Sequence, residues 1–452
     1  MTGVEGIAMT RALVRKIAKE FRGLFIRKHL REISFTLGTV SFGDCLKLVT
    51  FLLFHRQRVV EGEYIRQFEE EFSRYVGVSH AFSFGAGRMA FYAILKAMGV
   101  KEGDEVILPG YTCVVVPNAV VYCGARPVYL DIDVKTLTMD VRKVKEKLTD
   151  RTKVILVQPM FQACPDMEAI SSLAREHGVK VVEDCAHTLG ATYRGSKLGT
   201  FGDAAFFTLE QSKIFTTWMG GVAVTSDPEL ADRLRQFQSD TLFPDARAVR
   251  RTMWQLISCY FFLHPAFCFV GKYFMWFFSR VAGFMPTIQP EEMSAIRPEG
   301  YPTRLSNIQA RLALRQLLRI EANLRRRREI AASYDVALRG LELTVAEQKD
   351  YLPAYIRYTL LARDRERLKD LFSKNQVELG EWYNSVVHPT GSSLEAVCYE
   401  EGSCPVAEFA AEHCVNLPTH PKVSQGDVRR IVRLLQQNAD LLLDPHKEPV
   451  DV

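Results

Sequence analysis

The feature that most constrains the fold is an alternation of short apolar runs and helix-period segments across residues 62–240. Apolar residues recur at helical spacing between several of the strand-like runs, for example in 88–99 and 165–178. Such alternation is typical of a mostly parallel β-sheet with helices on both faces. We therefore predict an α/β fold, with strands at 104–109, 127–133, 153–159, 180–184, 204–208 and 220–227.

The chain of 452 residues is long enough for more than one domain. A long amphipathic stretch at 306–340 precedes a last region with one strand-like run and two helical segments. We expect five parts: an N-terminal basic amphipathic extension (1–60), a large α/β domain (61–240), an aromatic-rich insertion (241–300), a long connecting helix (301–340) and a small C-terminal α+β domain (341–452).

Charge and cysteine usage narrow the class of protein. The 58 basic and 53 acidic residues give a net charge of +5, and most basic residues alternate with acidic ones, which argues against a nucleic-acid partner. The ten cysteines form no CxxC or CxxH spacing. We interpret them as reduced core residues of a cytoplasmic protein, and we expect neither a disulfide framework nor a metal site.

Residues 11–31 depart from this average, with eight basic residues and one acidic residue. Leu13, Ile17, Phe21 and Leu24 recur at helical spacing, so one face of the predicted helix is apolar. A helix on an anionic membrane and a basic helix packed on its own protein explain this pattern equally well. A cleaved organellar presequence is a lesser alternative.

Residues 252–285 hold twelve aromatic residues, and 252–271 carry no formal charge. That length suffices to span a bilayer, but polar residues interrupt the run and Pro265 would kink a helix. A helix–break–helix that dips into one leaflet is favoured, and a buried aromatic core or dimer contact is the alternative. The expected location is cytoplasmic, with peripheral contact to the inner face of the cytoplasmic membrane.

Ligands bind beyond the carboxyl ends of the strands in such sheets, where two residues of opposite charge stand out. Asp184 ends the run "KVVED", and Lys213 follows "AAFFT" in "FFTLEQSKIF". The two residues can simply form an ion pair. Alternatively, they can hold pyridoxal phosphate, which needs a lysine for a Schiff base and a carboxylate on its pyridine nitrogen. The Gly-rich turn at 84–91, which opens a helix, suits the phosphate group.

The chain resembles the DegT/DnrJ/EryC1/StrS family of pyridoxal-phosphate-dependent sugar aminotransferases over about 61–240 and 300–435. The resemblance rests on segments such as "GDEVILPGYTCVVVPNAVVYCGARPVYLDID", "VVEDCAHTLGATYRGSKLGTFGDAAFFTLEQSK" and "TRLSNIQARLAL". It implies a fold-type-I aminotransferase, pyridoxal 5'-phosphate as the cofactor, and a homodimer.

The resemblance also implies residue roles. Lys213 matches the catalytic Schiff-base lysine, and Asp184 matches the partner of the pyridine nitrogen. His187 matches a residue beside the phenolic oxygen or the ring face of the cofactor. Thr208, Gly87 and Arg88 are implied to contact the phosphate of the cofactor. His388 and Arg304 are implied to contact the substrate.

Several positions depart from the family pattern. Arg88 stands where Thr or Ser is usual, and we expect its charge to contact the phosphate. The usual Asn-Tyr-Arg reads Pro302-Thr303-Arg304, so the asparagine that reaches the partner subunit's phosphate is missing, and Arg88 is a candidate to compensate. Cys113 replaces a frequent aromatic residue, which leaves ring stacking on the cofactor open.

The expected function is transfer of an amino group from an amino acid, by analogy glutamate, to a keto-sugar. The acceptor is expected to be nucleotide-linked, or lipid-linked if the protein binds membranes, in surface polysaccharide, glycolipid or amino-sugar biosynthesis. Two alternatives are a pyridoxal-phosphate sugar dehydratase or lyase and a non-catalytic, membrane-associated regulatory protein. Lys213 argues against the dehydratase, because members with that activity carry histidine there.

Overall fold

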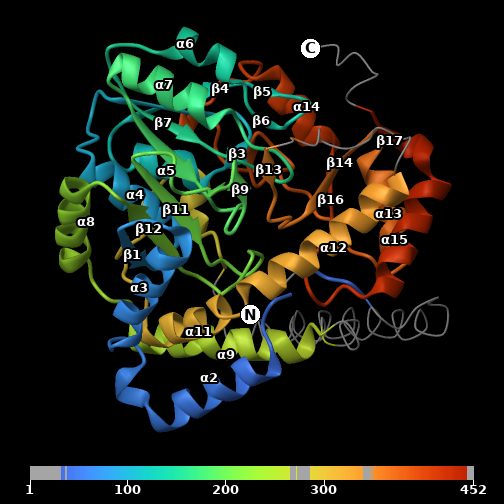
Figure 1. Ribbon diagram of the computed structural model, residues 1–452, viewed down its shortest axis with the longest axis horizontal. Helices are drawn as coiled ribbons and strands as arrows, with labels where there is room; N and C mark the ends of the chain where they lie inside the picture. The colour runs from blue at the N-terminus through green and yellow to red at the C-terminus, as the bar shows by residue number, and fades with distance from the viewer. Residues whose placement is uncertain are drawn as a thin grey trace, which may run out of the picture.

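The computed structural model describes residues 32–35, 38–264, 271, 286–338, 348 and 350–444. A seven-stranded sheet lies at the centre of these residues, and a smaller domain lies beside it (Figure 1). The order of the strands in the large sheet is β1 (His80–Phe84), β12 (Gly221–Thr225), β11 (Ala204–Thr208), β8 (Lys180–Asp184), β7 (Thr152–Val157), β2 (Glu105–Pro109) and β4 (Arg126–Leu130).

The predicted sheet is confirmed. Strands β11, β8, β7, β2 and β4 are mutually parallel, and β12 runs antiparallel to both of its neighbours. The sequence analysis predicted every strand of this sheet except β1. The chain therefore has the mostly parallel α/β sheet that the sequence analysis predicted.

Side-chain alternation along the strands separates two apolar cores, one on each face of the sheet. In β11, Ala204 and Phe206 face one core, and Ala205 and Phe207 face the other. The first core contains residues of α4 (Gly87–Ala97), α5 (Val115–Val121) and α8 (Pro228–Asp240), and the second those of α3 (Tyr64–Val76), α7 (Met167–His177) and α11 (Asn307–Leu317).

The small domain is built on a three-stranded antiparallel sheet of order β16-β14-β17. The long helix predicted at 306–340 is two helices, because α11 ends at Leu317 and α12 starts at Ile320. At the turn between them, the Arg319 N–H bonds the Gln316 carbonyl only three residues back, 3.0 Å away. The elements of the small domain are α12 (Ile320–Leu338), β14 (Tyr358–Ala362), α13 (Arg365–Lys374), α14 (Pro405–His413), β16 (Cys414–Leu417), α15 (Gln425–Gln437) and β17 (Leu442–Leu443).

Short elements complete the described chain. The strand pairs and triplet are β15 (Val387–His388) with β3 (Thr112–Cys113), β5 (Ile132–Asp133) with β6 (Thr138–Met139), and β10 (Ser196–Lys197) with β9 (Thr192–Tyr193) and β13 (Tyr351–Leu352). The short helices are η1 (Arg56–Arg58), η2 (Val141–Lys143), α6 (Val144–Lys147), η3 (Pro290–Ser294), η4 (Glu395–Val397) and η5 (Ala439–Leu441).

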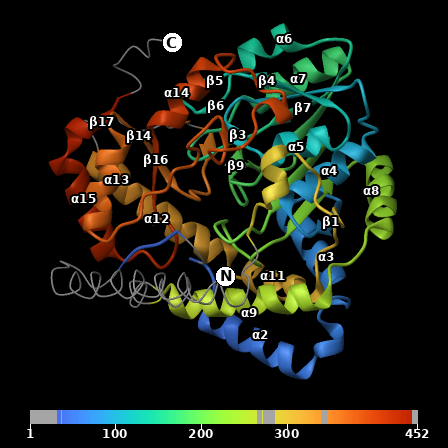
Figure 2. The ribbon, with the colours of Figure 1, turned by 180° about the vertical axis from the view of Figure 1, so that it is seen from behind.

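Helices α2 (Phe42–Phe54) and α9 (Ala246–Phe262) lie beside α11 along one edge of the molecule (Figures 1 and 2). Their inward residues form an apolar core of their own, with Leu48 and Phe51 of α2 against Met253 and Leu256 of α9. Helix α9 occupies the start of the aromatic segment, and the predicted break and second helix lie outside the described residues. Within the described chain, no helix is long and apolar enough to cross a bilayer.

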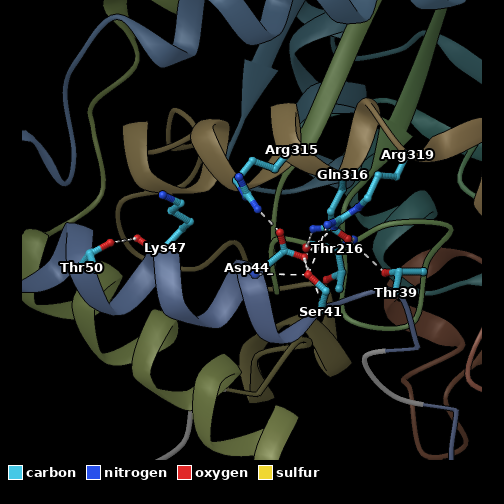
Figure 3. A network of polar contacts seen from close by, with 9 residues as sticks. All are labelled: Thr39, Ser41, Asp44, Lys47, Thr50, Thr216, Arg315, Gln316 and Arg319. Carbon is cyan, nitrogen blue, oxygen red and sulfur yellow. Dashed lines mark hydrogen bonds and ion pairs between the residues drawn. The ribbon is translucent and has the colours of Figure 1, made fainter.

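A polar network fastens α2 to the rest of the protein (Figure 3). Asp44 is fully buried and accepts hydrogen bonds from Arg315 Nε at 3.1 Å and Arg319 Nη2 at 2.6 Å. Gln316, on the same helix as Arg315, exchanges hydrogen bonds with both backbone groups of Thr216. The network thus holds the segment just after Lys213 against α11.

Candidate active site

A cavity of about 460 Å³ lies at the carboxyl ends of β8 and β11, and both domains line it. It brings together most of the residues that the sequence analysis selected. Six of the eight line it directly: Gly87, Arg88, Asp184, Thr208, Lys213 and His388.

Lys213 lies in a turn that follows β11. The turn closes on itself, because the N–H of Leu209 bonds the Gly220 carbonyl and the N–H of Thr217 bonds the Leu209 carbonyl. Lys213 Nζ lies 4.1 Å from the centre of the Trp382 ring. Burial lowers the pKa of Lys213 to about 8, against the opposing charge of Glu210. A substantial fraction of the amine is therefore neutral near pH 8, which a nucleophile or a base requires.

Asp184 is the last residue of β8, and its side chain is almost fully buried. The Ala186 N–H donates to its Oδ1 at 2.9 Å. Burial raises the pKa of this carboxyl to about 6, although that hydrogen bond and the Lys213 charge favour the ionised form. Asp184 is thus an anion at neutral pH that a nearby cation, such as a protonated pyridine nitrogen, would stabilise further.

The N-terminus of α4 approaches β11 and β12 at a distance that only glycine allows. A Cβ on Gly87 would lie 2.6 Å from the Cβ of Thr208, and one on Gly221 would lie 2.3 Å from the Ala86 carbonyl oxygen. Ala86, the N-cap residue of α4, provides no side-chain cap. First-turn N–H groups of a helix attract phosphate, so this end of the cavity fits the phosphate of the expected cofactor.

His187 lies buried behind the cavity, between Trp382 and Phe161. Its ring stacks on Trp382 with centroids 5.1 Å apart and an interplanar angle of 10°. Burial, together with the Lys213 charge, lowers the pKa of His187 well below its usual value, so the ring is neutral. Its Nδ1 is buried and has no hydrogen-bond partner in the described part of the chain. An orphaned ring nitrogen fits a missing polar group, such as the phenolic oxygen of the cofactor.

His388 reaches the cavity through a short parallel pairing of β15 with β3, in which it lies opposite Cys113. Its Nδ1 lies 2.7 Å from Asn384 Oδ1. Burial lowers the pKa of His388 to about 4, and the charges of Arg357 and Lys213 contribute. His388 therefore offers hydrogen bonds to a substrate but no positive charge at neutral pH.

Arg88 has a protein partner that the sequence analysis did not predict. Its Nε lies 2.5 Å from Oε1 of the fully buried Glu292, and its Nη1 donates to the Thr287 carbonyl at 3.0 Å. Both partners come from the 241–300 insertion, so Arg88 joins the insertion to the cavity. A buried carboxylate thus already balances its charge, and its contact with the phosphate stays a prediction.

Arg304 does not line the cavity of its own chain. Its backbone pairs with Phe84, and its guanidinium carbon lies 4.3 Å from the centre of the Phe243 ring. The expectation of a substrate contact there therefore finds no support within the single chain, because ring stacking holds the side chain at the edge of the sheet.

Apart from His388, the sequence analysis missed the residues of the small domain that line the cavity. Trp382, Tyr383 and Arg357 approach it from segments far from Lys213 in sequence. Tyr111 is buried near the cavity and donates to the Tyr383 carbonyl at 2.8 Å. The neighbourhood of His388 in "WYNSVVHP" was the one available signal for Trp382 and Tyr383.

Comparisons with known proteins agree with this geometry. The profile of the DegT/DnrJ/EryC1/StrS aminotransferase family matches residues 46–436. A GDP-perosamine synthase from Caulobacter vibrioides is 31% identical over 380 residues, which cover 83% of this chain and 90% of that protein. The crystal structure of DesV from S. venezuelae in complex with a ketimine intermediate has a TM-score of 0.69 and 25% identity, with coverage of 88% and 95%. A putative sugar aminotransferase from Streptococcus pneumoniae, solved in its PLP form, shares the fold, with a TM-score of 0.69, 20% identity and coverage of 91% and 100%.

Proposed function

The chain belongs to the DegT/DnrJ/EryC1/StrS aminotransferase family, and we propose that it transfers an amino group from glutamate to a nucleotide-linked keto-sugar. It is a pyridoxal-phosphate-dependent sugar aminotransferase. The observation that carries the proposal is the meeting of Asp184 and Lys213 in one buried cavity beside a glycine-lined helix N-terminus. The nucleotide linkage and the glutamate donor are the finer part of the proposal.

The residues of the cavity would have different roles toward the cofactor. When bound, pyridoxal phosphate supplies an aldehyde that condenses with amines and a ring that accepts electrons. Lys213 would hold that aldehyde and would move the proton at the substrate carbon, for which its amine must be neutral. Asp184 would keep the pyridine nitrogen protonated. Thr208 and the first turn of α4 would hold the phosphate, and His187, whose Nδ1 has no partner in the described chain, is a candidate for a hydrogen bond to the phenolic oxygen.

The name of a relative supports the proposed acceptor. A relative named GDP-perosamine synthase supports a nucleotide-linked acceptor. His388 is the residue that we assign to the acceptor. We propose a homodimer, as the resemblance to the family implies.

Product analysis tests this function. The purified protein, incubated with glutamate and candidate nucleotide keto-sugars, should yield an amino-sugar and 2-oxoglutarate in equal amounts. Loss of water from the sugar without gain of nitrogen would identify the dehydratase alternative. A colourless protein that binds no pyridoxal phosphate would favour the non-catalytic one.

We propose further that the protein binds anionic membranes through the outer face of α2 and α9. This α2–α9 face exposes six large apolar residues, and Phe42 contacts Phe261 across the two helices, with ring centroids 6.3 Å apart. The two helices hold one carboxylate, Asp44, which is fully buried. The apolar residues are Phe42, Leu46, Leu53, Phe54, Trp254 and Phe261, and the exposed cations near them in sequence are Lys47, Arg56, Arg58, Arg247 and Arg251.

Apolar side chains between cations suit the interfacial region of a bilayer. Two segments rich in basic or aromatic residues are further candidates for this contact: 11–31, which precedes α2 in sequence, and 265–285, which follows α9. The full-length protein should float with vesicles that contain phosphatidylglycerol and less so with pure phosphatidylcholine vesicles. Trp254→Asp should reduce flotation, whereas Leu352→Asp, exposed elsewhere, should not. Equal flotation of both variants, or none of the native protein, would contradict the membrane proposal.

A further inference from the structure

One buried cation beside Lys213 has no role in the function described so far. Arg357 lines the cavity just before β14, and only 5% of its surface is exposed. Burial lowers the pKa of Arg357 to about 10, with Glu210 and Glu378 opposing, so the guanidinium is charged at neutral pH. A buried charge is costly unless a counter-ion or strong hydrogen bonds compensate it.

The protein provides little compensation. In the described chain, no carboxylate lies within ion-pair distance of Arg357, and its Nε has no hydrogen-bond partner. Its Nη1 makes one long hydrogen bond, 3.5 Å to Asn416 Oδ1. The equally buried Arg327 differs, because it donates to Asn323 Oδ1 at 2.9 Å and to the Ile356 carbonyl at 3.0 Å.

The surroundings nevertheless hold this guanidinium in a defined place. Its carbon lies 3.4 Å from the centre of the Trp382 ring and 4.5 Å from that of Phe35. A Cβ on Gly380 would lie 2.4 Å from its Nη1, so the glycine makes the space that the guanidinium fills. Aromatic stacking occupies the faces of a guanidinium and leaves the N–H groups in its plane for a planar anion such as a carboxylate.

Arg357 also lies close to the reacting amine. Trp382 is a shared neighbour: its ring centre is 3.4 Å from the Arg357 guanidinium and 4.1 Å from Lys213 Nζ. The sum of these distances is the largest separation that the two cations can have. In an amino acid, the carboxylate carbon is bonded to the same carbon that carries the amine, so an amine that reacts at Lys213 brings its carboxylate near Arg357.

We propose that Arg357 binds the α-carboxylate of the amino-acid donor. The diphosphate of a nucleotide sugar is the other anion in the reaction, but its phosphorus is at least three bonds from any carbonyl carbon of the ring. The donor carboxylate is therefore the anion that fits this depth of the cavity. This inference rests on the proposed aminotransferase function and adds the residue that selects amino acids over other amines.

The test separates the two half-reactions of the holoenzyme by rapid mixing and uses a chemical variant of the donor. The native enzyme should convert its cofactor with L-glutamate roughly 100-fold faster, as kcat/KM, than with L-isoglutamine, whose α-carboxylate is a neutral amide. Arg357→Gln should erase most of this preference by slowing glutamate alone. Arg357→Lys should keep part of it, because lysine retains the charge but not the planar fork.

Arg311→Gln is the matched control, because Arg311 also stacks on an aromatic ring but lies outside the cavity. It should keep the native preference. The second half-reaction, in which the amino form of the cofactor reacts with keto-sugar, should change less than threefold in Arg357→Gln.

Each other outcome overturns the inference. A native enzyme that does not distinguish the two donors has no carboxylate site at Arg357, even if the variants fail to fold. A loss confined to the keto-sugar half-reaction would assign Arg357 to the diphosphate, and equal losses with both donors would show a structural role. An enzyme that converts neither donor nor any other amine would instead overturn the proposed function.

Discussion

The two walls of the active-site cavity are built from different parts of the chain and carry different chemistry. The strand-end wall, formed by Gly87, Asp184, Thr208 and Lys213, belongs to the large sheet and holds the groups that a cofactor needs. The C-terminal wall, formed by Arg357, Trp382, Tyr383 and His388, comes from the small domain. Its half-buried histidine and buried arginine contribute hydrogen bonds and one uncompensated charge. The difference indicates that reactivity resides in the first wall and substrate selection in the second.

The largest effect is expected from Lys213→Ala, which removes the reactive amine of the strand-end wall. Turnover should fall by at least roughly 10⁴-fold, because nucleophile and proton carrier are lost together. Borohydride should no longer fix the cofactor to the protein, as mass spectrometry would show. Lys422→Ala is the matched control, since burial also lowers the pKa of Lys422 to about 8, yet Lys422 lines a different cavity. Retained fixation in Lys213→Ala would remove the lysine from its assigned role.

Asp184→Asn is expected to have the next largest effect. An amide cannot keep the pyridine nitrogen protonated, so the proton-transfer rate should fall by roughly 10²- to 10⁴-fold for every substrate, while the cofactor stays bound. Single-turnover absorbance measures this rate. Glu183→Gln is the control, because Glu183 is equally buried but accepts hydrogen bonds from the backbone N–H groups of Gly199, Phe201 and Gly202. Glu183→Gln should lower thermal stability and leave the proton-transfer rate unchanged. A slower rate in Glu183→Gln and an unchanged rate in Asp184→Asn would contradict the role assigned to Asp184.

The strand-end residues were predictable because a single physical rule places them. Parallel strands end at one edge of a sheet, so the residues that follow "KVVED" and "AAFFT" meet wherever those strands pair. No comparable rule predicts which residues form the C-terminal wall. His388 arrives through the pairing of two-residue strands, β15 with β3, whose sequences carry no periodicity. The ion pair of Arg88 with Glu292 joins residues 204 positions apart, and only tertiary packing shows it.

The pH dependence of Lys213 gives a third, smaller effect that is measurable without substrate. In the apoprotein, its pKa of about 8 lies below the usual value of 10.5, so the folded state binds fewer protons than the unfolded state between these values. Stability should therefore rise as the pH increases through this window. Competitive acetylation should show Lys213 half-neutral near pH 8, whereas an ordinary lysine has roughly 0.3% neutral amine there. In Asp184→Asn the midpoint should move to a lower pH, because Asp184 favours the charged amine. An unchanged midpoint would show that Asp184 does not influence the charge of Lys213.

The smallest effect is expected at Arg88, where the strand-end wall meets the insertion, and two variants are needed to interpret it. Arg88→Gln alone leaves the buried Glu292 without its partner, so a loss of stability is expected whatever Arg88 does for the cofactor. The double variant Arg88→Gln/Glu292→Gln removes both charges and should recover most of the melting temperature.

Cofactor affinity then decides the role of Arg88. If the guanidinium contacts the phosphate, both variants should bind pyridoxal phosphate roughly ten- to hundredfold more weakly than the native protein, measured as the dissociation constant from apoprotein titration. If Arg88 only anchors the insertion, the double variant should regain native affinity together with its stability. That result would reduce the strand-end wall to neutral phosphate ligands and would leave Arg357 as the cavity's one arginine with an uncompensated charge in the described chain.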